Sequence, residues 1–186
     1  IESALAASSP EILILNGGAV PHMAPLHEQT WESFSRNWEV DVKASFLWVQ
    51  AALNRPLRPG TRVVLSSSGA AVNGSPLSGS YAGAKRMIWL MAQYANATSA
   101  AKGLGIRFQA VIPLQIVGDT DLGRAAAEAY ARQRGVSPAD LLAGFGAPLL
   151  PAEYGRRIVE MLLDPRFDAV PAFTVKGDAG VQAMTA

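Results

Sequence analysis

Residues 62–85, "RVVLSSSGAAVNGSPLSGSYAGAK", decide the fold class of this chain. The stretch opens with a continuous apolar run that leads into three serines and Gly69, a pattern typical of a buried strand with a tight exit. It closes on small residues around Tyr81 and Lys85, where a strongly helical segment begins. A buried strand followed by a long helix is the repeating unit of a parallel α/β sheet, so the stretch predicts an α/β protein.

Other apolar runs repeat this pattern along the chain. Residues 12–15, "ILIL", end at Asn16-Gly17-Gly18, and residues 106–113, "IRFQAVIP", follow the helix predicted over about 80–101. A helix over 151–165 and a last strand within 169–178 complete the pattern. Continuous apolar runs separated by long helices indicate buried parallel strands joined by crossover helices.

The helix predicted between the first two strands begins after Thr30 as N-cap and is closed by Pro56. Its period places one row toward the sheet: Trp31, Phe34, Trp38, Val42, Ser45, Val49 and Leu53. The opposite side is also apolar, with Val40, Ala44, Leu47 and Ala51. We therefore expect a second copy of the chain to cover it, in a homodimer or homotetramer. The alternative is that this side is buried within the same chain. In the helix over 80–101, the expected core stripe is Met87, Met91, Tyr94 and Thr98.

Composition excludes several classes of function. The 186 residues, 49% of them hydrophobic, fit one domain, and 16 basic against 15 acidic residues suggest neither nucleic-acid nor membrane binding. There is no cysteine, and the two histidines, His22 and His27, lie in a loop containing proline, so we expect no metal site. No signal peptide is evident, which favours the cytoplasm.

Three polar residues form a candidate reaction centre. Ser68 stands at the exit of a strand, where parallel sheets meet their ligands, and Tyr81 and Lys85 lie one helical turn apart. A cation near a phenol favours the tyrosinate, so we expect Lys85 to lower the pKa of Tyr81. Tyr81 would then exchange a proton with a substrate oxygen held by Ser68. Each residue alone also has a simpler interpretation. Tyr81 and Lys85 could be an exposed helical pair, and the three serines before Gly69 could form a turn.

These residues resemble the short-chain dehydrogenase/reductase family from about residue 11 to the last strand. "YAGAK" is similar to its Tyr-x-x-x-Lys motif, "VLSSSG" to the strand end with its catalytic serine, and "LNGGA" to its Asn-Asn-Ala-Gly turn. The resemblance implies a Rossmann-type doubly wound parallel sheet in three layers, NAD or NADP as cofactor, and hydride transfer to or from a carbonyl or alcohol. It implies Tyr81 as acid and base, Ser68 (or Ser67, if the strand is offset) as the group holding the oxygen, and Lys85 on the nicotinamide ribose. The cofactor-binding residues that it implies are Asn16, Gly18, Tyr81, Lys85, Pro113, Ile116 and Thr120.

The chain departs from the family pattern in three places. Asp41 stands where the family has a catalytic asparagine, and because ionised Asp accepts hydrogen bonds and repels a tyrosinate, a proton relay there is doubtful. Leu114 replaces a glycine, and Thr120 follows Pro113 by seven residues rather than five. The Gly-rich dinucleotide turn is missing, so we expect residues 1–186 to be one domain, the C-terminal part of a longer fold.

Two matters stay open at this level. Residues 119–150 combine alanine-rich helical pieces with glycine and proline breaks, which predicts a mobile substrate flap; its Tyr130, Leu141, Leu142 and Phe145 suit an apolar substrate or an internal core. A non-catalytic binding or assembly module that keeps the family fold is the alternative to an enzyme. Hydrolysis by the serines ranks last, since no G-x-S-x-G motif occurs.

Overall fold

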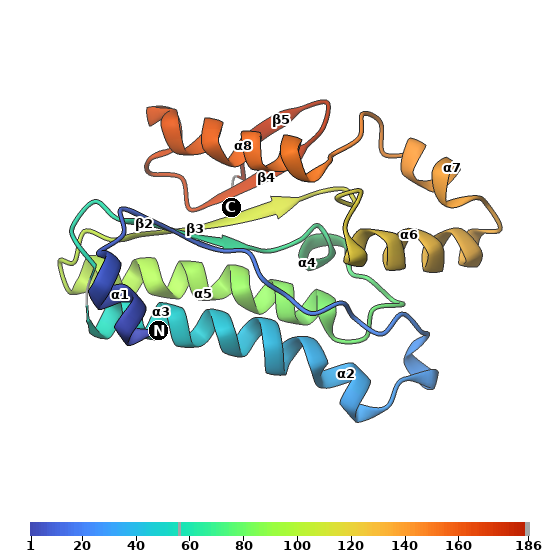
Figure 1. Cartoon of the computed structure of the whole chain (residues 1–186), viewed down its shortest axis with the longest axis horizontal. Helices are drawn as coiled ribbons and strands as arrows, with labels where there is room; N and C mark the ends of the chain where they lie inside the picture. Colours follow the sequence, from blue (N-terminus) through green and yellow to red (C-terminus); the bar gives the residue numbers. More distant parts are fainter. Residues whose placement is uncertain (56, 185–186) are drawn as a thin grey trace.

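One twisted sheet forms the centre of the molecule, whose computed structural model describes residues 1–55 and 57–184 (Figure 1). Neighbouring strands follow chain order, and the first four are parallel. The fifth pairs antiparallel with the fourth. The strands are β1 (Ile12–Leu15), β2 (Arg62–Ser66), β3 (Arg107–Pro113), β4 (Ala172–Lys176) and β5 (Gly180–Ala183). The α/β class and its parallel sheet are therefore confirmed.

Strand positions agree with the apolar runs, except at the C-terminal end. β2 is buried at every position, as expected for a strand covered on both faces. The last strand predicted within 169–178 is β4, and a further strand, β5, follows it because Gly180 adopts a left-handed backbone (φ 66°) after a three-residue loop and turns the chain back. β5 was not predicted, because its four residues show no strong alternation of apolar and polar side chains.

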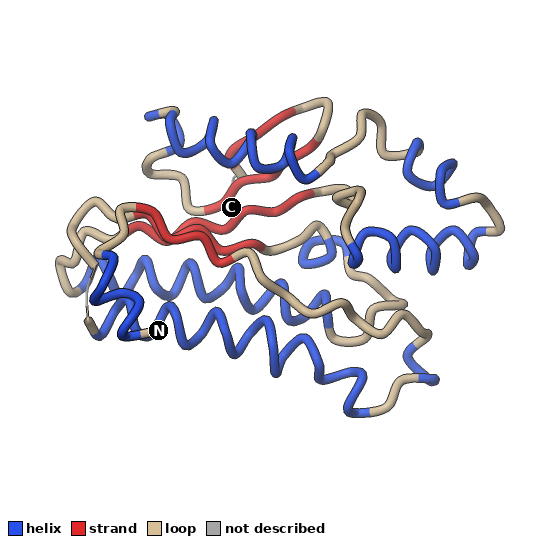
Figure 2. Tube along the Cα trace, in the orientation of Figure 1, coloured by secondary structure: helices blue, strands red, loops and turns tan. Residues whose placement is uncertain are grey.

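Helices cover both faces of the sheet (Figure 2). On one side lie α3 (Lys43–Asn54) and α5 (Tyr81–Ala101), with α1 (Glu2–Ser8) and α2 (Trp31–Asn37) at their ends; on the other lies α8 (Pro151–Leu163) (Figure 1). A core that includes Val63, Leu65 and Phe108 packs toward α3 and α5, and a second that includes Val64, Phe173 and Met161 packs toward α8. The three-layer arrangement follows from this alternation of β-strand side chains.

The long helix expected over 31–53 contains a π-helical segment, η2 (Trp38–Val42), between α2 and α3. The extra residue rotates the helix, so Asn37 and Asp41 are buried, whereas Trp31 (78% exposed) and Trp38 (40%) are not. The prediction that Trp31 and Trp38 face the sheet is therefore wrong. Pro56, predicted to close the helix, lies outside the described residues.

In α5 the buried stripe is also rotated from its predicted position. Its members are Tyr81, Ala84, Lys85, Ile88, Trp89, Met91, Ala92, Ala95 and Ser99. Tyr94, expected in the core, is 58% exposed. Small alanines in the buried stripe let α5 approach the sheet closely. The prediction relied on hydropathy and therefore placed larger residues in the core.

The remaining elements surround the C-terminal edge of the sheet or connect strands. These are η1 (Leu26–Glu28), α4 (Ala70–Asn73), α6 (Asp121–Arg134), α7 (Pro138–Ala143) and η3 (Pro165–Phe167). α6 runs away from the tip of β3, and α7 follows it (Figure 1). Their shared core is small, consisting of Ala127, Ala131 and Leu141.

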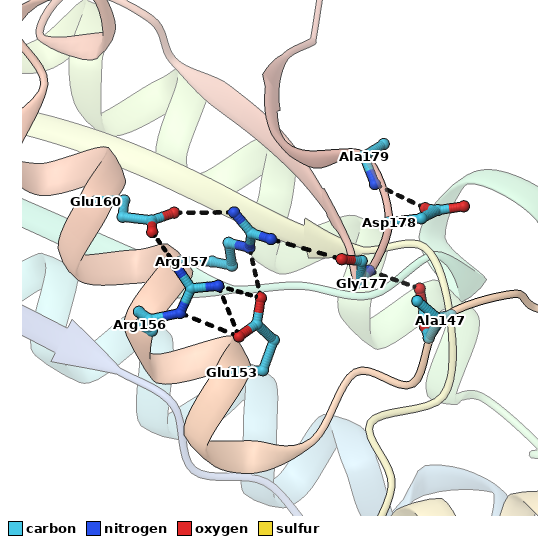
Figure 3. A network of polar contacts seen from close by, with 9 residues as sticks. Ala147, Glu153, Arg156, Arg157, Glu160, Gly177, Asp178 and Ala179 are labelled. Carbon is cyan, nitrogen blue, oxygen red and sulfur yellow. Dashed lines mark hydrogen bonds and ion pairs between the residues drawn. The ribbon is translucent and has the colours of Figure 1, made fainter.

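The segment that follows α7 is held at the sheet by hydrogen bonds between one side chain and two backbone groups. The Gln115 side chain donates to Ala147 O (2.9 Å) and accepts from the amide of Gly177 (2.9 Å). Arg157 of α8 pairs with Glu153 (2.8 Å) and Glu160 (3.1 Å) beside the same turn (Figure 3). A side chain at Gly177 would meet Ala147 O at 2.3 Å, so only glycine fits this crossing.

Among the described residues, no helix combines the length and the apolar character needed to cross a bilayer.

Candidate active site

Ser68 and Tyr81 approach each other across the C-terminal edge of the sheet. Ser68 follows the end of β2, and Tyr81 begins α5; both line one cavity. Ser68 is near enough to Tyr81 for its hydroxyl to act on the pKa of the phenol and lower it. Ser67, the residue expected in their place if the strand is offset, is buried and donates to the carbonyl of Lys85 (2.8 Å). Ser68 is therefore the serine of this pair that faces the cavity.

Tyr81 is a protonated phenol at neutral pH. The pKa of Tyr81 is raised to about 12, mainly by burial and to a smaller extent by the charges of Asp41 and Tyr154, with the Ser68 hydroxyl acting in the opposite direction. The expectation that Lys85 brings this pKa down toward neutrality is wrong. The main reason is burial of the phenol, and the carboxylate that Lys85 takes as its partner adds to it.

Lys85 and Asp41 form a buried ion pair behind the tyrosine. The ammonium lies 3.2 Å from Asp41 Oδ2 and 3.4 Å from the carbonyl of Ser66, and both side chains are almost fully enclosed. The same ammonium lies 5.6 Å from the centre of the Tyr81 ring. Because the two charges are opposite and lie 3.2 Å apart, the carboxylate offsets the field that the ammonium exerts on the phenol.

The sequence around Asp41 is adapted to this carboxylate. Asp41 Oδ1 accepts from the amide of Ala19 (2.8 Å), and Oδ2 lies within 3.4 Å of Asn37 Nδ2. A β-carbon on Gly18 would meet Oδ2 at 2.8 Å, so the glycine leaves room for the buried charge. Nearby, Asn16 accepts a hydrogen bond from Ser66 Oγ (2.6 Å). The turn after β1, which contains Gly18, and the π-helical segment η2 thus meet at Asp41.

The residues expected beside the nicotinamide are only partly brought together. Pro113, Leu114 and Ile116 line the cavity next to Ser68 and Tyr81. Thr120 instead caps α6: its hydroxyl donates to Val117 O (3.0 Å) and accepts from the amide of Gly123 (2.9 Å). The cofactor roles of these residues stay predictions.

The cavity encloses about 480 Å³ between the sheet edge and α6. One face of α6 contributes Leu122, Ala126, Tyr130 and Arg134, and α7 and its end add Leu141 and Phe145. The loop between β2 and α5 supplies the opposite side. The volume suits a small organic molecule.

Two tyrosines have roles in the site that sequence reasoning missed. The Tyr130 hydroxyl bonds to Ser75 Oγ (2.7 Å) and accepts from the amide of Leu77 (3.3 Å), which ties α6 to the loop before α5. The Tyr154 hydroxyl of α8 lies 3.5 Å from Ser66 Oγ, within the same polar cluster as Asn16. No sequence signal pairs residues so far apart, and for Tyr154 the sequence predicts only a place in a helix over 151–165.

Comparisons with known proteins show what the chain resembles in sequence and in fold. A family model described as enoyl-(acyl carrier protein) reductase matches residues 5–148. A 2,5-dichloro-2,5-cyclohexadiene-1,4-diol dehydrogenase from Sphingobium indicum is 30% identical over 118 residues, which are 58% of this chain and 46% of that protein. The chain thus spans about half the length of this curated relative.

Solved structures share the fold at lower identity. A short chain dehydrogenase family protein from Francisella tularensis subsp. tularensis SCHU S4 superposes with a TM-score of 0.75, at 21% identity over 95% of this chain and 73% of that chain. An angucycline C-6 ketoreductase with bound NADP gives 0.67, at 24% identity over 92% and 64%. A 4-hydroxyisoleucine dehydrogenase mutant complexed with NADH and succinate gives 0.69, at 17% identity over 94% and 70%.

Proposed function

We propose, since this chain belongs to the short-chain dehydrogenase/reductase family, that it is an oxidoreductase that transfers hydride between NAD or NADP and a carbonyl or alcohol. The observation that supports this most is the meeting of the Ser68 and Tyr81 hydroxyls at one cavity, with Lys85 behind them. The named relatives support it too, because they are dehydrogenases and reductases, two of them with a bound nicotinamide dinucleotide.

The residues present fit the nicotinamide end of such a cofactor. Pro113 and Ile116 give a largely apolar wall beside Tyr81, which suits a flat ring. Lys85 has three N–H donors, of which two point to Asp41 and Ser66, and the third is left for the ribose hydroxyls. Asn16 and Gly18 would lie toward the adenosine side, and Thr120 beyond the nicotinamide. The bound cofactor supplies or accepts the hydride.

The protein's own contribution is to hold and protonate the substrate oxygen. Ser68 and Tyr81 donate hydrogen bonds to that oxygen, which stabilises negative charge as it develops. Tyr81 then gives its phenolic proton to the oxygen, so a carbonyl that gains a hydride at carbon leaves as a neutral alcohol. Because burial keeps Tyr81 protonated, the resting site is prepared for reduction. Asp41 acts as a positioning residue, by fixing Lys85.

Oxidation of NADH or NADPH with a panel of ketones tests this function. Tyr81→Phe should lower kcat by at least a thousandfold, because the proton donor is lost. Tyr94→Phe is the matched control, since Tyr94 is exposed on the same helix. Activity that survives Tyr81→Phe would contradict the proposal.

The second candidate is a non-catalytic binding or assembly module. The ion pair favours it, because Asp41 offsets the charge that would otherwise activate Tyr81. Isothermal titration with NADH and NADPH distinguishes the two, since a module of this kind binds neither.

We also propose that residues 119–150 act as a substrate flap and that the chain is a homo-oligomer. The flap has its own small core, and α2, η2 and α3 together expose Trp31, Val40, Phe46 and Leu47. An apolar face of this kind suits a second copy of the chain. Light scattering measures the oligomeric state, and a Phe46→Glu variant should shift it toward monomer.

A further inference from the structure

The outer end of the cavity differs in charge from its inner end. Among the described residues that line it, Arg134 is the only one with a charged side chain, and no acidic side chain accompanies it. Arg134 occupies the last turn of α6, twelve residues after Leu122 on the same cavity-facing side. At 1.5 Å per residue, about 18 Å of helix separates the two positions.

The chain provides no internal partner for this guanidinium. Within residues 1–55 and 57–184, Arg134 makes no ion pair or hydrogen bond, whereas Arg124 on the same helix pairs with Asp121. The residues three and four positions before Arg134 are Ala131 and Tyr130, so the helix offers it no acidic neighbour on that side. Arg134 thus lines the cavity with a guanidinium of five N–H donors for which the described residues supply no acceptor.

The surroundings of Arg134 indicate how a ligand would reach it. Tyr130, one turn earlier, is fixed by Ser75 and Leu77 and so shapes the wall between the two ends. Between Tyr81 and Arg134 the lining includes Leu122, Ala126 and Leu141, which favour an apolar body. A molecule that fits all three zones has a reacting oxygen, an apolar body and an anion.

We infer that the substrate is an oxo or hydroxy acid, with its carbonyl or hydroxyl at Ser68 and Tyr81 and its carboxylate held by Arg134. This substrate class rests on the proposed function. Arginine matches a carboxylate with two parallel hydrogen bonds, and such charge-assisted bonds are stronger than neutral ones. The apolar zone separates this acid from a free inorganic anion, which has no body to fill it.

Calorimetric titration of the 186-residue chain with octanoate and methyl octanoate tests the inference without requiring turnover. Octanoate should bind the unmodified chain, and Arg134→Gln should weaken its affinity roughly tenfold. Arg134→Lys should recover part of the loss, and methyl octanoate should bind all variants alike. Added salt should weaken octanoate binding, because Arg134 is exposed.

Arg132→Gln is the matched control, since Arg132 lies in the same helical turn but outside the cavity lining. An equal loss in Arg132→Gln, or equal affinity for acid and ester, would overturn the inference. Failure of the unmodified chain to bind octanoate would also overturn the inference. Acetate that binds as well as octanoate would overturn it too, because Arg134 would then be a general anion contact. Turnover of neutral ketones with no preference for acids would remove this inference alone, whereas absent turnover with intact octanoate binding would remove the proposed function alone.

Discussion

The inner and outer walls of the cavity are built on different principles. The inner wall, formed by Ser68 and Tyr81, rests on a buried ion pair, Lys85 with Asp41, and on a large core between sheet and helices. The outer wall, formed by α6 and α7, rests on a few alanines and Leu141 and on the hydrogen bonds of Tyr130. This difference suggests that the inner wall, with its large core, performs the chemistry, and that the outer wall, with its small core, selects the substrate.

The largest expected difference between the walls is in stability. Asp41→Ala should lower the free energy of unfolding by about 3–5 kcal/mol, because the Lys85 ammonium would remain buried without a counter-charge. Urea denaturation measures this loss. Asp121→Ala, which removes an exposed pair from the outer wall, should cause no measurable change. Equal effects of the two variants would show that the walls are not distinct.

The next largest effect concerns the serine that faces the cavity. Ser68→Ala should lower kcat by roughly 10²–10³-fold, because one donor to the developing oxyanion is lost. Ser67→Ala should leave kcat within about tenfold and lower stability by about 1 kcal/mol, since its hydroxyl bonds to the Lys85 carbonyl. A larger kinetic loss in Ser67→Ala would reverse the assignment. Steady-state kinetics and urea denaturation of both variants make the comparison.

The inner wall also determines the pH profile. Alcohol oxidation needs Tyr81 as a base, so its rate should rise with pH toward the raised pKa of about 12. Asp41→Asn removes a negative charge that raises the pKa of Tyr81, so the rising limb should move to lower pH. Rates of NAD(P)H formation between pH 7 and pH 11, on the order of half-unit steps, follow this limb. A limb that moves to higher pH would contradict the charge argument.

The smallest effect is expected in the outer wall. Tyr130→Phe removes two hydrogen bonds to the loop before α5, so KM should rise about fivefold while kcat stays nearly constant. Tyr94→Phe serves as the control, because that hydroxyl belongs to an exposed side chain. A fall in kcat with unchanged KM would place Tyr130 with the chemistry instead.

The sequence predicted those features that depend on neighbours along the chain. The strands follow from continuous apolar runs, and the meeting of Ser68 with Tyr81 follows from a strand exit and a helix start separated by one loop. The resemblance to the family then supplied roles for these residues. Boundaries of β2 and β3 agree with the predicted runs to within a few residues.

Features that depend on distant partners could not be predicted in this way. The raised pKa of Tyr81 depends first on its burial and then on the charge of Asp41, whose partner Lys85 lies 44 positions away in the sequence. The exposure of Trp31 and Trp38 depends on a π-helical turn, which leaves no mark in hydropathy. Thr120 became a helix cap because the longer spacing after Pro113 brought it to the start of α6.

The central claim is that burial, together with the charge of Asp41 beside Lys85, leaves Tyr81 a protonated acid. The most direct test is an ultraviolet difference titration of the four-tyrosine chain against Tyr81→Phe, which isolates the ionisation of this one phenol. The account predicts no Tyr81 ionisation until the pH approaches about 12. Ionisation at or below the ordinary tyrosine value of about 10 would show that Lys85 acts on the phenol unopposed, and would contradict the account.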